Sequence, residues 1–478
     1  MNLDQDLLAR QEARDLAARS EQAQKILSQM TQTQLDTICE AVSKAFFQKA
    51  YELAELAVRE TGFGNVEDKV TKNRFASQRV LEAIRDMKTV GVLEKPREGK
   101  LWQIGVPVGV IAAIVPSTNP TSTVCYKALI ALKAGCSIVF SPHPKALECT
   151  RLAAKIVATA AEAAGAPPGS VACLSVPSLE GCKELMTAAQ TRLILATGGP
   201  AMVRSAYSSG KPAIGVGAGN GPAYIHRSAD VEQALSCILR SKSFDYGTVC
   251  ASEQSIIVEA AMETQVREKA KTMGFYFMNK EEAGNLAKLL FRPNGTLNPA
   301  IVGKPATFLA EKAGFCVPNT TRVLVAREQE AGPTRPYSME KLCPVLAFFV
   351  MESEDAVLEK AIEVLTHEGS GHTFAIHAQD KAVVEKFALQ IPVSRFLVNT
   401  PAALGGIGAT TKLFPALTLG CGAVGGSSSS NNISPMDLIN IRRVAFDVEE
   451  AEKLSPAAQI QEDDLVQIIT ARILEKLK

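Results

Sequence analysis

The segment Val110-Ile111-Ala112-Ala113-Ile114-Val115-Pro116-Ser117-Thr118-Asn119-Pro120 decides the fold class of this chain. Its first half is an uninterrupted apolar, β-branched run, which is typical of a strand buried on both faces. Its second half is a turn whose hydroxyl groups can cap a helix. Ser122 to Ala134 continues as the predicted helix, and Gly135 predicts its end. A buried strand followed at once by a helix is typical of a parallel α/β sheet.

The same alternation continues on both sides of a midpoint near residue 228. Before it, we predict strands at 137–140, 171–176 and 192–196, with helices at 145–164, 179–188 and 201–208. After it, we predict strands at 254–258, 321–325, 345–350, 373–376 and 395–398, with helices at 231–243, 262–273, 356–365 and 381–389. Single-helix connections imply right-handed crossovers and open parallel sheets with both faces covered. The sequence therefore predicts two α/β domains, the first with a dinucleotide-domain architecture.

Other segments flank these domains. Residues 5–60 predict amphipathic helices, and the short alternating runs of 87–111 predict hairpin strands. A glycine- and serine-rich loop is predicted at 399–432 and a late strand at 438–446. The tail predicts a linker and then an amphipathic helix over 462–478, which either docks on its own domain or detaches to bind a partner.

Composition excludes several classes of protein. The 478 residues carry a formal net charge of +1, with 46% hydrophobic and 21% charged residues, which argues against a nucleic-acid partner. The polar, acidic first residues show no secretory signal, and no apolar run reaches the length of a membrane span. The 11 cysteines form no C-x-x-C pair and the 5 histidines are scattered, so we expect reduced thiols in the cytosol and no metal site.

The segment Phe244-Asp245-Tyr246-Gly247-Thr248-Val249-Cys250-Ala251-Ser252-Glu253-Gln254 holds the candidate nucleophile. Cys250 follows a glycine turn and precedes a short apolar run, where backbone N–H groups are free and a thiol can react. Most cysteines of such a chain are small buried hydrophobes, so the position alone does not decide.

Two glycine turns could approach a ligand. Thr197-Gly198-Gly199-Pro200 precedes a helix, whose bare N-terminus can hold a phosphate, and the turn 215–221 lies between two strands. Each turn also has an ordinary structural explanation. The first-turn glycine fingerprint of dinucleotide domains is missing, so it offers no argument for a cofactor.

Seven ordered segments carry a resemblance to a known family. They are 114–120, 140–144, 196–200, the Cys250 segment, 340–345, 371–373, and 398–401 through 420–422. Together they resemble the aldehyde dehydrogenase superfamily, and within it the CoA-acylating branch, which includes the acetaldehyde and propionaldehyde dehydrogenases of ethanolamine and propanediol utilisation. The resemblance covers nearly the whole chain to about residue 446.

The resemblance implies an aldehyde dehydrogenase-like α/β fold with two Rossmann-type parallel-sheet domains and a β-hairpin oligomerisation element. We expect a cofactor-binding domain at 1–228 with its hairpin at about 88–106, and a catalytic domain at 229–418. A return segment with an oligomerisation strand is expected at 419–450, and the linker and C-terminal helix at 451–478. A homodimer or homotetramer is implied.

The resemblance also assigns roles to residues. Cys250 matches the catalytic thiol, Asn119 the side-chain donor to the oxyanion, and Glu340 the acid at the nicotinamide ribose. Thr197 and Gly198 match the turn near the pyrophosphate. The other positions implied for cofactor binding are Pro116, Ser141, His143, Gly199 and Gly217. His372 is the best candidate for the general base, although a lone histidine is as well explained by a structural role.

Two departures from the family pattern are informative. Hydrolytic members carry a glutamate base in a Glu-Leu-Gly-Gly run, where this chain has Val216-Gly217-Ala218-Gly219. The Lys and Glu that usually hold the adenosine ribose are missing around Ser141 to Pro144. The first departure favours transfer of the acyl group to a thiol over transfer to water.

The predicted function is NAD-dependent oxidation of acetaldehyde or propionaldehyde to the acyl-CoA through a thioester on Cys250. The alternatives are a hydrolytic aldehyde dehydrogenase, a thioester-exchanging acyltransferase without a redox step, and a non-catalytic scaffold. The sequence leaves open which of the two aldehydes is preferred, because one methylene is worth only about 1 to 3 kcal/mol. By resemblance, the C-terminal helix predicts targeting to a bacterial microcompartment shell.

Overall fold

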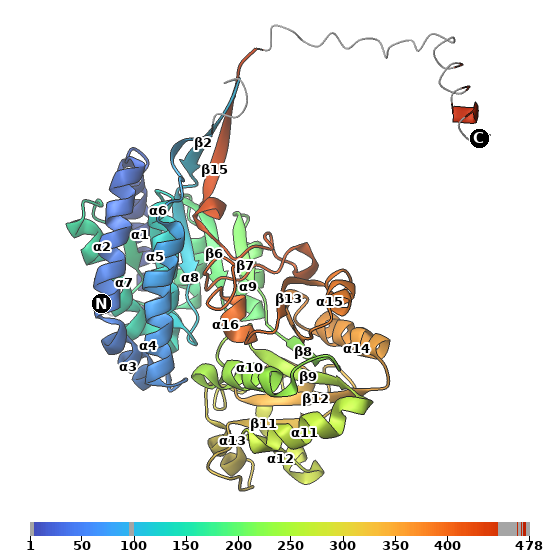
Figure 1. The fold of residues 1–478 in the computed structure, drawn as a ribbon. Coiled ribbons are helices and arrows are strands. Elements are labelled where there is room, and N and C mark those ends of the chain that lie inside the picture. Colours follow the sequence, from blue (N-terminus) through green and yellow to red (C-terminus); the bar gives the residue numbers. More distant parts are fainter. Residues whose placement is uncertain (1–3, 95–99, 448–465, 467–469, 471, 475–478) are drawn as a thin grey trace. The chain divides into compact units, whose positions relative to one another are not determined.

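The computed structural model describes residues 4–94, 100–447, 466, 470 and 472–474 (Figure 1). The chain divides into two compact units, one of Met1–Gly91 with Val106–Asn440 and one of Val92–Gly105 with Ile441–Lys478. The predicted helix at 462–478 lies outside the described residues except at 466, 470 and 472–474. Residues 95–99 of the predicted hairpin also lie outside them.

A five-stranded, all-parallel sheet is the first of two sheets in the larger unit. Its order is β5 (Val171–Cys173), β4 (Ile138–Ser141), β3 (Val110–Ile114), β6 (Thr191–Thr197) and β7 (Ala213–Val216). The central strand β3 is buried at all five positions, as its continuous apolar run predicted. The prediction of a parallel α/β sheet is confirmed.

Helices from three parts of the chain cover this sheet. Helices α1 (Gln5–Leu27) and α8 (Leu179–Thr187) pack on the face to which Val110, Ala112 and Ile114 point. Helices α6 (Pro120–Lys133) and α7 (Leu147–Ala163) pack against β4 and β5, and α2 (Gln32–Gln48) lies over both helices. Every residue of α6 is buried, and its Lys127 donates to the carbonyl groups of Ile114 and Leu195, at 2.8 and 2.9 Å.

The second sheet of the larger unit has seven parallel strands. Its order is β10 (Phe275–Phe277), β11 (Val323–Arg327), β12 (Val345–Met351), β9 (Glu253–Glu259), β8 (Gly221–Ile225), β13 (Gly371–His377) and β14 (Val393–Val398). Ile256 packs with α10 (Val231–Ser243) and α11 (Glu263–Thr272) on one face. Its neighbour Ile257 packs on the other face with α12 (Lys280–Leu290), α13 (Ala306–Lys312), α14 (Glu354–His367) and α15 (Lys381–Ala388).

The strands change from the first sheet to the second between β7 and β8. The domain ranges given above stay predictions.

Three stretches differ from the sequence prediction. No element was predicted between 273 and 321, which holds β10, α12 and α13. No element was predicted between 62 and 86, where α3 (Ala50–Thr61) is followed by α4 (Val66–Arg74), a π-helical turn at Phe75–Arg79 and α5 (Val80–Ile84). The buried face of α4 includes two lysines and an asparagine, so it lacks the apolar stripe on which helix prediction depends. The prediction that 399–432 is entirely loop is wrong at α16 (Ala402–Gly406). The first N–H of α16 is capped by Glu253, a residue 149 positions away, and no local pattern reveals such a contact.

The smaller unit is built around a three-stranded sheet. Its strands are β1 (Gly91–Glu94), β2 (Leu101–Pro107) and β15 (Ile439–Ala445), in that order. The rings of Trp102 and Phe446 lie 5.1 Å apart, and the N–H of Phe446 donates to the carbonyl of Lys100. The predicted late strand is confirmed, while its role in oligomerisation stays a prediction. No helix among the described residues is long and apolar enough to cross a membrane.

Candidate active site

A cavity of about 260 Å³ in the larger unit brings together most of the predicted site residues. The loops after β3, β4 and β6 supply one part of its lining. The loop between β7 and β8, the segments before β9 and β12 and the segment after β14 supply most of the rest. Nine of the predicted residues line it: Pro116, Asn119, His143, Thr197, Gly198, Gly199, Gly217, Cys250 and Glu340. Ser141 and His372 do not line it.

Cys250 lies between a short 3₁₀ turn, η3 (Phe244–Gly247), and the start of β9. Asp245 and Tyr246 have φ angles of 48° and 50°, a conformation that non-glycine residues rarely adopt and that is often found at functional sites. Cys250 as a residue is partly buried. Burial, together with the nearby Glu340, raises the pKa of Cys250 to about 12, while Arg395 opposes the rise. The resting sulfur is therefore a thiol, and a proton must leave it before it can act as a nucleophile.

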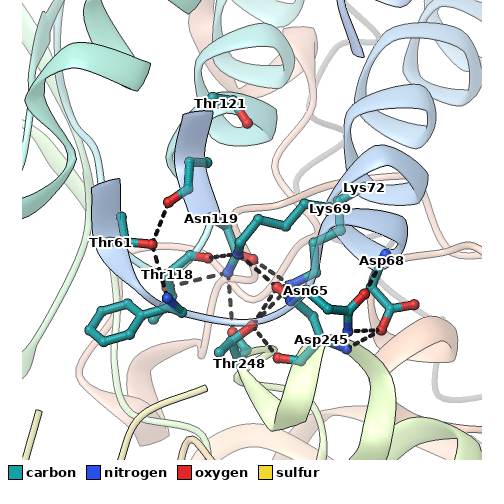
Figure 2. A network of polar contacts seen from close by, with 12 residues as sticks. Thr61, Asn65, Asp68, Lys69, Lys72, Thr118, Asn119, Thr121, Asp245 and Thr248 are labelled. Carbon is teal, nitrogen blue, oxygen red and sulfur yellow. Dashed lines mark hydrogen bonds and ion pairs between the residues drawn. The ribbon is translucent and has the colours of Figure 1, made fainter. Parts of the chain in front are cut away.

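The side-chain amide of Asn119 is held from two sides at the start of α6. Lys72 donates to its Oδ1 at 2.6 Å, and its Nδ2 donates to the carbonyl of Thr248 at 3.2 Å (Figure 2). Since Thr248 precedes Cys250 by two residues, the amide nitrogen is tied to the segment that carries the thiol. This arrangement provides an N–H donor beside the nucleophile.

Glu340 lines the same cavity and contacts the loop before β8. Its Oε1 accepts the N–H of Gly219 at 2.9 Å. Burial and the neighbouring Glu368 raise the pKa of Glu340 to about 8, so its carboxyl group is mostly neutral at pH 7. Among the described residues that line the cavity, Glu340 is the only carboxylic acid. Val216, at the end of β7, lines the cavity with an apolar side chain.

The glycine turns present bare backbone to the cavity. The turn Thr197-Gly198-Gly199 leads into α9 (Pro200–Tyr207), and the backbone of the turn lines the cavity. A Cβ added to Gly199 or to Gly217 would meet no atom within 4 Å. An open cradle of this kind fits the pyrophosphate of a dinucleotide. Glu340 could hold a ribose hydroxyl in the same cavity.

The remaining candidates occupy different surroundings. His143 lines the cavity, and its Nδ1 accepts the N–H of Lys145 at 3.1 Å. Ser141 is buried at the end of β4. His372 is fully buried, with Nδ1 2.8 Å from the Thr373 hydroxyl and Nε2 without a partner among the described residues. Burial and the nearby Arg395 hold the pKa of His372 well below its usual range, so the ring is neutral.

The sequence interpretation missed a buried charged cluster next to the site. Lys69 and Lys72 of α4 both contact the carboxylate of Asp245, and Lys72 also lines the cavity. It also missed Arg395, which is buried at 2% exposure and donates to the carbonyl of Gly420 at 2.7 Å. Asp245 could have been noticed because it lies close to Cys250 in the sequence. No sequence spacing connects Asp245 with Lys69 or Lys72, which lie 176 and 173 positions away.

A parallel α/β fold with a partly buried thiol, an amide donor and a glycine-lined cradle fits the class of thiol-dependent enzymes that bind a dinucleotide. The aldehyde dehydrogenase family matches residues 5–274 of the chain. The bifunctional aldehyde-alcohol dehydrogenase AdhE of Escherichia coli K12 is 45% identical over 90% of the chain. The chain spans about half the length of that relative, 49%.

Solved structures match over more of their length. An acetylating aldehyde dehydrogenase from Geobacillus thermoglucosidasius is 48% identical, with a TM-score of 0.92, and the match covers 94% of this chain and 99% of that one. Propionaldehyde dehydrogenase from Rhodopseudomonas palustris, solved with bound CoA and an acylated cysteine, is 27% identical with a TM-score of 0.82, over 91% and 97%. The chain belongs to the aldehyde dehydrogenase family. Its resemblance to the CoA-acylating branch is confirmed by these relatives.

Proposed function

We propose that this protein oxidises a short-chain aldehyde with NAD⁺ and transfers the acyl group to CoA. One observation carries the proposal: Cys250 and the amide of Asn119 line one cavity, whose wall at position 216 is valine. Hydrolytic members of the family place the base for water at that position. The acylated cysteine and CoA in the Rhodopseudomonas relative support the same chemistry.

The residues divide the reaction between them. The thiolate of Cys250 bonds to the aldehyde carbon, and the carbonyl oxygen becomes an oxyanion. The amide of Asn119 and the N–H of Cys250 donate to that oxygen, an effect worth about 3 kcal/mol per donor. A bound nicotinamide supplies the hydride acceptor. As the carbon–oxygen double bond re-forms, Cys250 is left carrying the acyl group as a thioester.

The second half of the reaction releases the acyl group. The thiolate of CoA adds to the thioester carbon, the bond to the Cys250 sulfur breaks, and the sulfur leaves as a thiolate. Water is a poor competitor because Val216 cannot accept its proton. Glu340 is mostly neutral at pH 7, and its Oε1 is engaged by the N–H of Gly219. The acyl group therefore persists until a thiol arrives.

We assign NAD⁺ to the cradle formed by Thr197, Gly198, Gly199 and Gly217, with Glu340 at the nicotinamide ribose and with Pro116 and His143 along the same cavity. Ser141 is assigned to the cofactor by resemblance alone, since it lies off the cavity wall. His372 stays the proposed general base for Cys250 or for CoA. Its Nε2 has no partner among the described residues and could accept a proton, but its lowered pKa makes it a weak base and it does not line the cavity.

The experiment mixes protein, NAD⁺ and acetaldehyde or propionaldehyde, with and without CoA, and follows NADH by absorbance. We expect sustained NADH formation only with CoA, a single-turnover burst without it, and an acyl mass on the peptide that contains Cys250. Cys250→Ala should abolish both signals. Sustained NADH without CoA would assign the hydrolytic reaction instead. Absence of NADH from the wild-type protein would leave the exchange enzyme or the scaffold.

We also propose the finer assignments that followed from the resemblance. Residues 1–228 form the cofactor-binding domain, 229–418 the catalytic domain, 419–450 the return segment and 451–478 the linker and helix. The strands β2 and β15 join subunits in a dimer or tetramer. The C-terminal helix targets the enzyme to a microcompartment shell, which its apolar stripe of Leu465, Ile469, Ile473 and Leu477 supports. Deleting 456–478 should keep the activity and abolish co-purification with shell proteins, and unchanged co-purification would refute this role.

A further inference from the structure

A buried cluster of three charged side chains lies beside the oxyanion donor (Figure 2). Lys69 and Lys72 are three positions apart on α4, so they lie on the same face of the helix. Both are 3% exposed, and both contact Oδ2 of Asp245, which is 0% exposed, at 2.9 and 2.5 Å. Two ammonium groups therefore share one buried carboxylate, and a second, partly buried carboxylate, that of Asp68, accepts the N–H of Asp245 at 2.7 Å.

Further contacts of Asp245 fix the position of its carboxylate relative to the neighbouring backbone. Its Oδ1 accepts the N–H of Asn65 at 2.9 Å, and its Oδ2 also accepts the hydroxyl of Thr248 at 2.7 Å. A Cβ on Gly64 would lie 1.7 Å from the same carboxylate. Only a glycine at position 64 leaves room for it.

All three N–H donors of Lys72 are used in hydrogen bonds. An ammonium group has three N–H donors, and those of Lys72 reach Asn119 Oδ1 at 2.6 Å, Asp245 Oδ2 at 2.5 Å and Thr248 Oγ1 at 3.1 Å. No donor is left over for a substrate. Lys72 can therefore influence the reaction only through the groups it already holds, and Asn119 is the one among them that faces the reacting atoms.

The contacts also fix which end of the Asn119 amide is which. Lys72 can only donate, so it selects the oxygen of the amide. The carbonyl of Thr248 can only accept, so it selects the nitrogen, at 3.2 Å. The second N–H contact of Nδ2 is a 3.3 Å approach to the neighbouring Thr118 hydroxyl, a group that rotates freely enough to yield to a stronger acceptor. An oxyanion is such an acceptor.

We propose that Lys72 is a positioning residue of this reaction: it locks the Asn119 amide with its nitrogen toward the oxyanion and polarises the N–H bond that stabilises it. This inference rests on the proposed function. A hydrogen bond accepted by the amide oxygen from a cation strengthens donation by the amide nitrogen. Asp245 holds Lys72 in place. Lys69 neutralises the charge of the Asp245 carboxylate, so the positive charge of Lys72 acts on the amide oxygen of Asn119.

The chain offers a matched control. Lys69→Met and Lys72→Met each remove one lysine and leave the other paired with Asp245, so neither variant leaves an isolated buried charge. The two lysines differ in their partners besides Asp245, because Lys69 donates to the backbone carbonyl of Thr118 at 2.9 Å and not to the amide of Asn119. Both variants should therefore lose similar amounts of thermal stability, and only one should affect the oxyanion donor.

The test is a double-mutant cycle with Asn119→Ala, measured as kcat and KM for CoA-dependent NADH formation. Removing an oxyanion donor costs about 10² to 10³ in kcat, so we expect Lys72→Met to lower kcat about 10- to 100-fold with little change in the KM of the aldehyde. In the Asn119→Ala background the same change should add less than about twofold, because its target is gone. The effect of Lys69→Met should multiply with that of Asn119→Ala. Equal multiplication for both lysines would overturn the inference.

A crystal structure of Lys72→Met tests the positioning role without depending on a measurement of activity. We expect the Asn119 side chain to rotate or lose its contact with Thr248, whereas in Lys69→Met it should stay. If Asn119 keeps its orientation without Lys72, the positioning role is wrong even in an active enzyme. If the wild-type protein makes no NADH, the proposed function fails, and the two crystal structures still decide whether Lys72 orients the amide.

Discussion

Replacing Gly219 by alanine tests whether the loop before β8 sets the position of the nucleophile. A Cβ on Gly219 would lie 1.9 Å from the carbonyl oxygen of Cys250 and 2.7 Å from its carbonyl carbon. Both are backbone atoms, so no side-chain rotation can relieve the clash. To reach ordinary contact at 3.4 Å, the two backbones must separate by about 1.5 Å. Gly219 does not have a positive φ, so the clash is the only strain that alanine introduces.

The displacement predicts a large loss of rate. A misplacement on the order of 1 Å costs about 10²-fold in rate, so we expect kcat of Gly219→Ala to fall about 100-fold. The same movement would break the hydrogen bond from the N–H of Gly219 to Glu340, now 2.9 Å. The rate at which iodoacetamide alkylates Cys250 should change as well, because the thiol and its neighbours move apart.

Gly217→Ala is the matched control for this prediction, two residues earlier in the same loop. Its Cβ would meet no atom within 4 Å and would project into open space in the cofactor cradle. We expect this variant to raise the KM for the dinucleotide and to leave the alkylation rate of Cys250 as in the wild type. Wild-type kcat and alkylation in Gly219→Ala would refute the reasoning, and so would an equal change in the alkylation rate in both variants.

Three further predictions follow from the buried charges. Asp245→Asn leaves two ammonium groups in the interior without a carboxylate partner. It should lower the free energy of unfolding, measured by urea titration, by about 3 to 5 kcal/mol. A decrease below about 1 kcal/mol would contradict the burial of the cluster. The pKa of Glu340 is raised to about 8 from a model-peptide value of 4.5, so its contribution to stability is present below pH 4.5 and is lost as the pH rises through 8. Glu340→Gln should therefore gain stability relative to the wild type between pH 5 and pH 8.5, and a constant difference would show that this carboxyl group is not buried neutral. Arg395 lowers the pKa of Cys250, so Arg395→Met should shift the pH dependence of Cys250 alkylation upward, as followed by peptide mass mapping; an unshifted profile would place the guanidinium too far from the sulfur to act.

Much of the fold was predictable from the sequence because strands buried on both faces leave an unambiguous pattern. Every position of β3 and of β9 is buried. β3 was predicted from its continuous apolar run, and β9 from the short apolar run Ile256-Ile257-Val258 within it. Asn119, Thr197 and Cys250 were predictable for a related reason, since each lies in a polar or glycine turn next to such a strand. The resemblance to a family then supplied the roles that these positions could not reveal alone.

The charged cluster could not be predicted in the same way. Lys72 belongs to a helix whose buried face is polar, so hydrophobic periodicity does not mark it. Its partner Asp245 lies 173 positions away, and in the sequence both residues look like ordinary surface charges. Only the packing of α4 against the turn before Cys250 shows that the charges are buried and paired.

The placement of the cavity explains why the site is scattered along the chain. In an open parallel sheet, ligands usually bind at the carboxyl ends of the strands. The first sheet follows this rule, because the loops after β3, β6 and β7 line the cavity. From the second sheet, Cys250 and Glu340 come from the segments before β9 and β12, at its opposite edge. The first sheet therefore contributes the cradle for the dinucleotide and the amide of Asn119, and the second contributes the thiol. The amide of Asn119 and the thiol of Cys250 therefore need a contact that joins their two segments and fixes their relative position. Lys72 provides this contact, because it binds both Asn119 and Asp245.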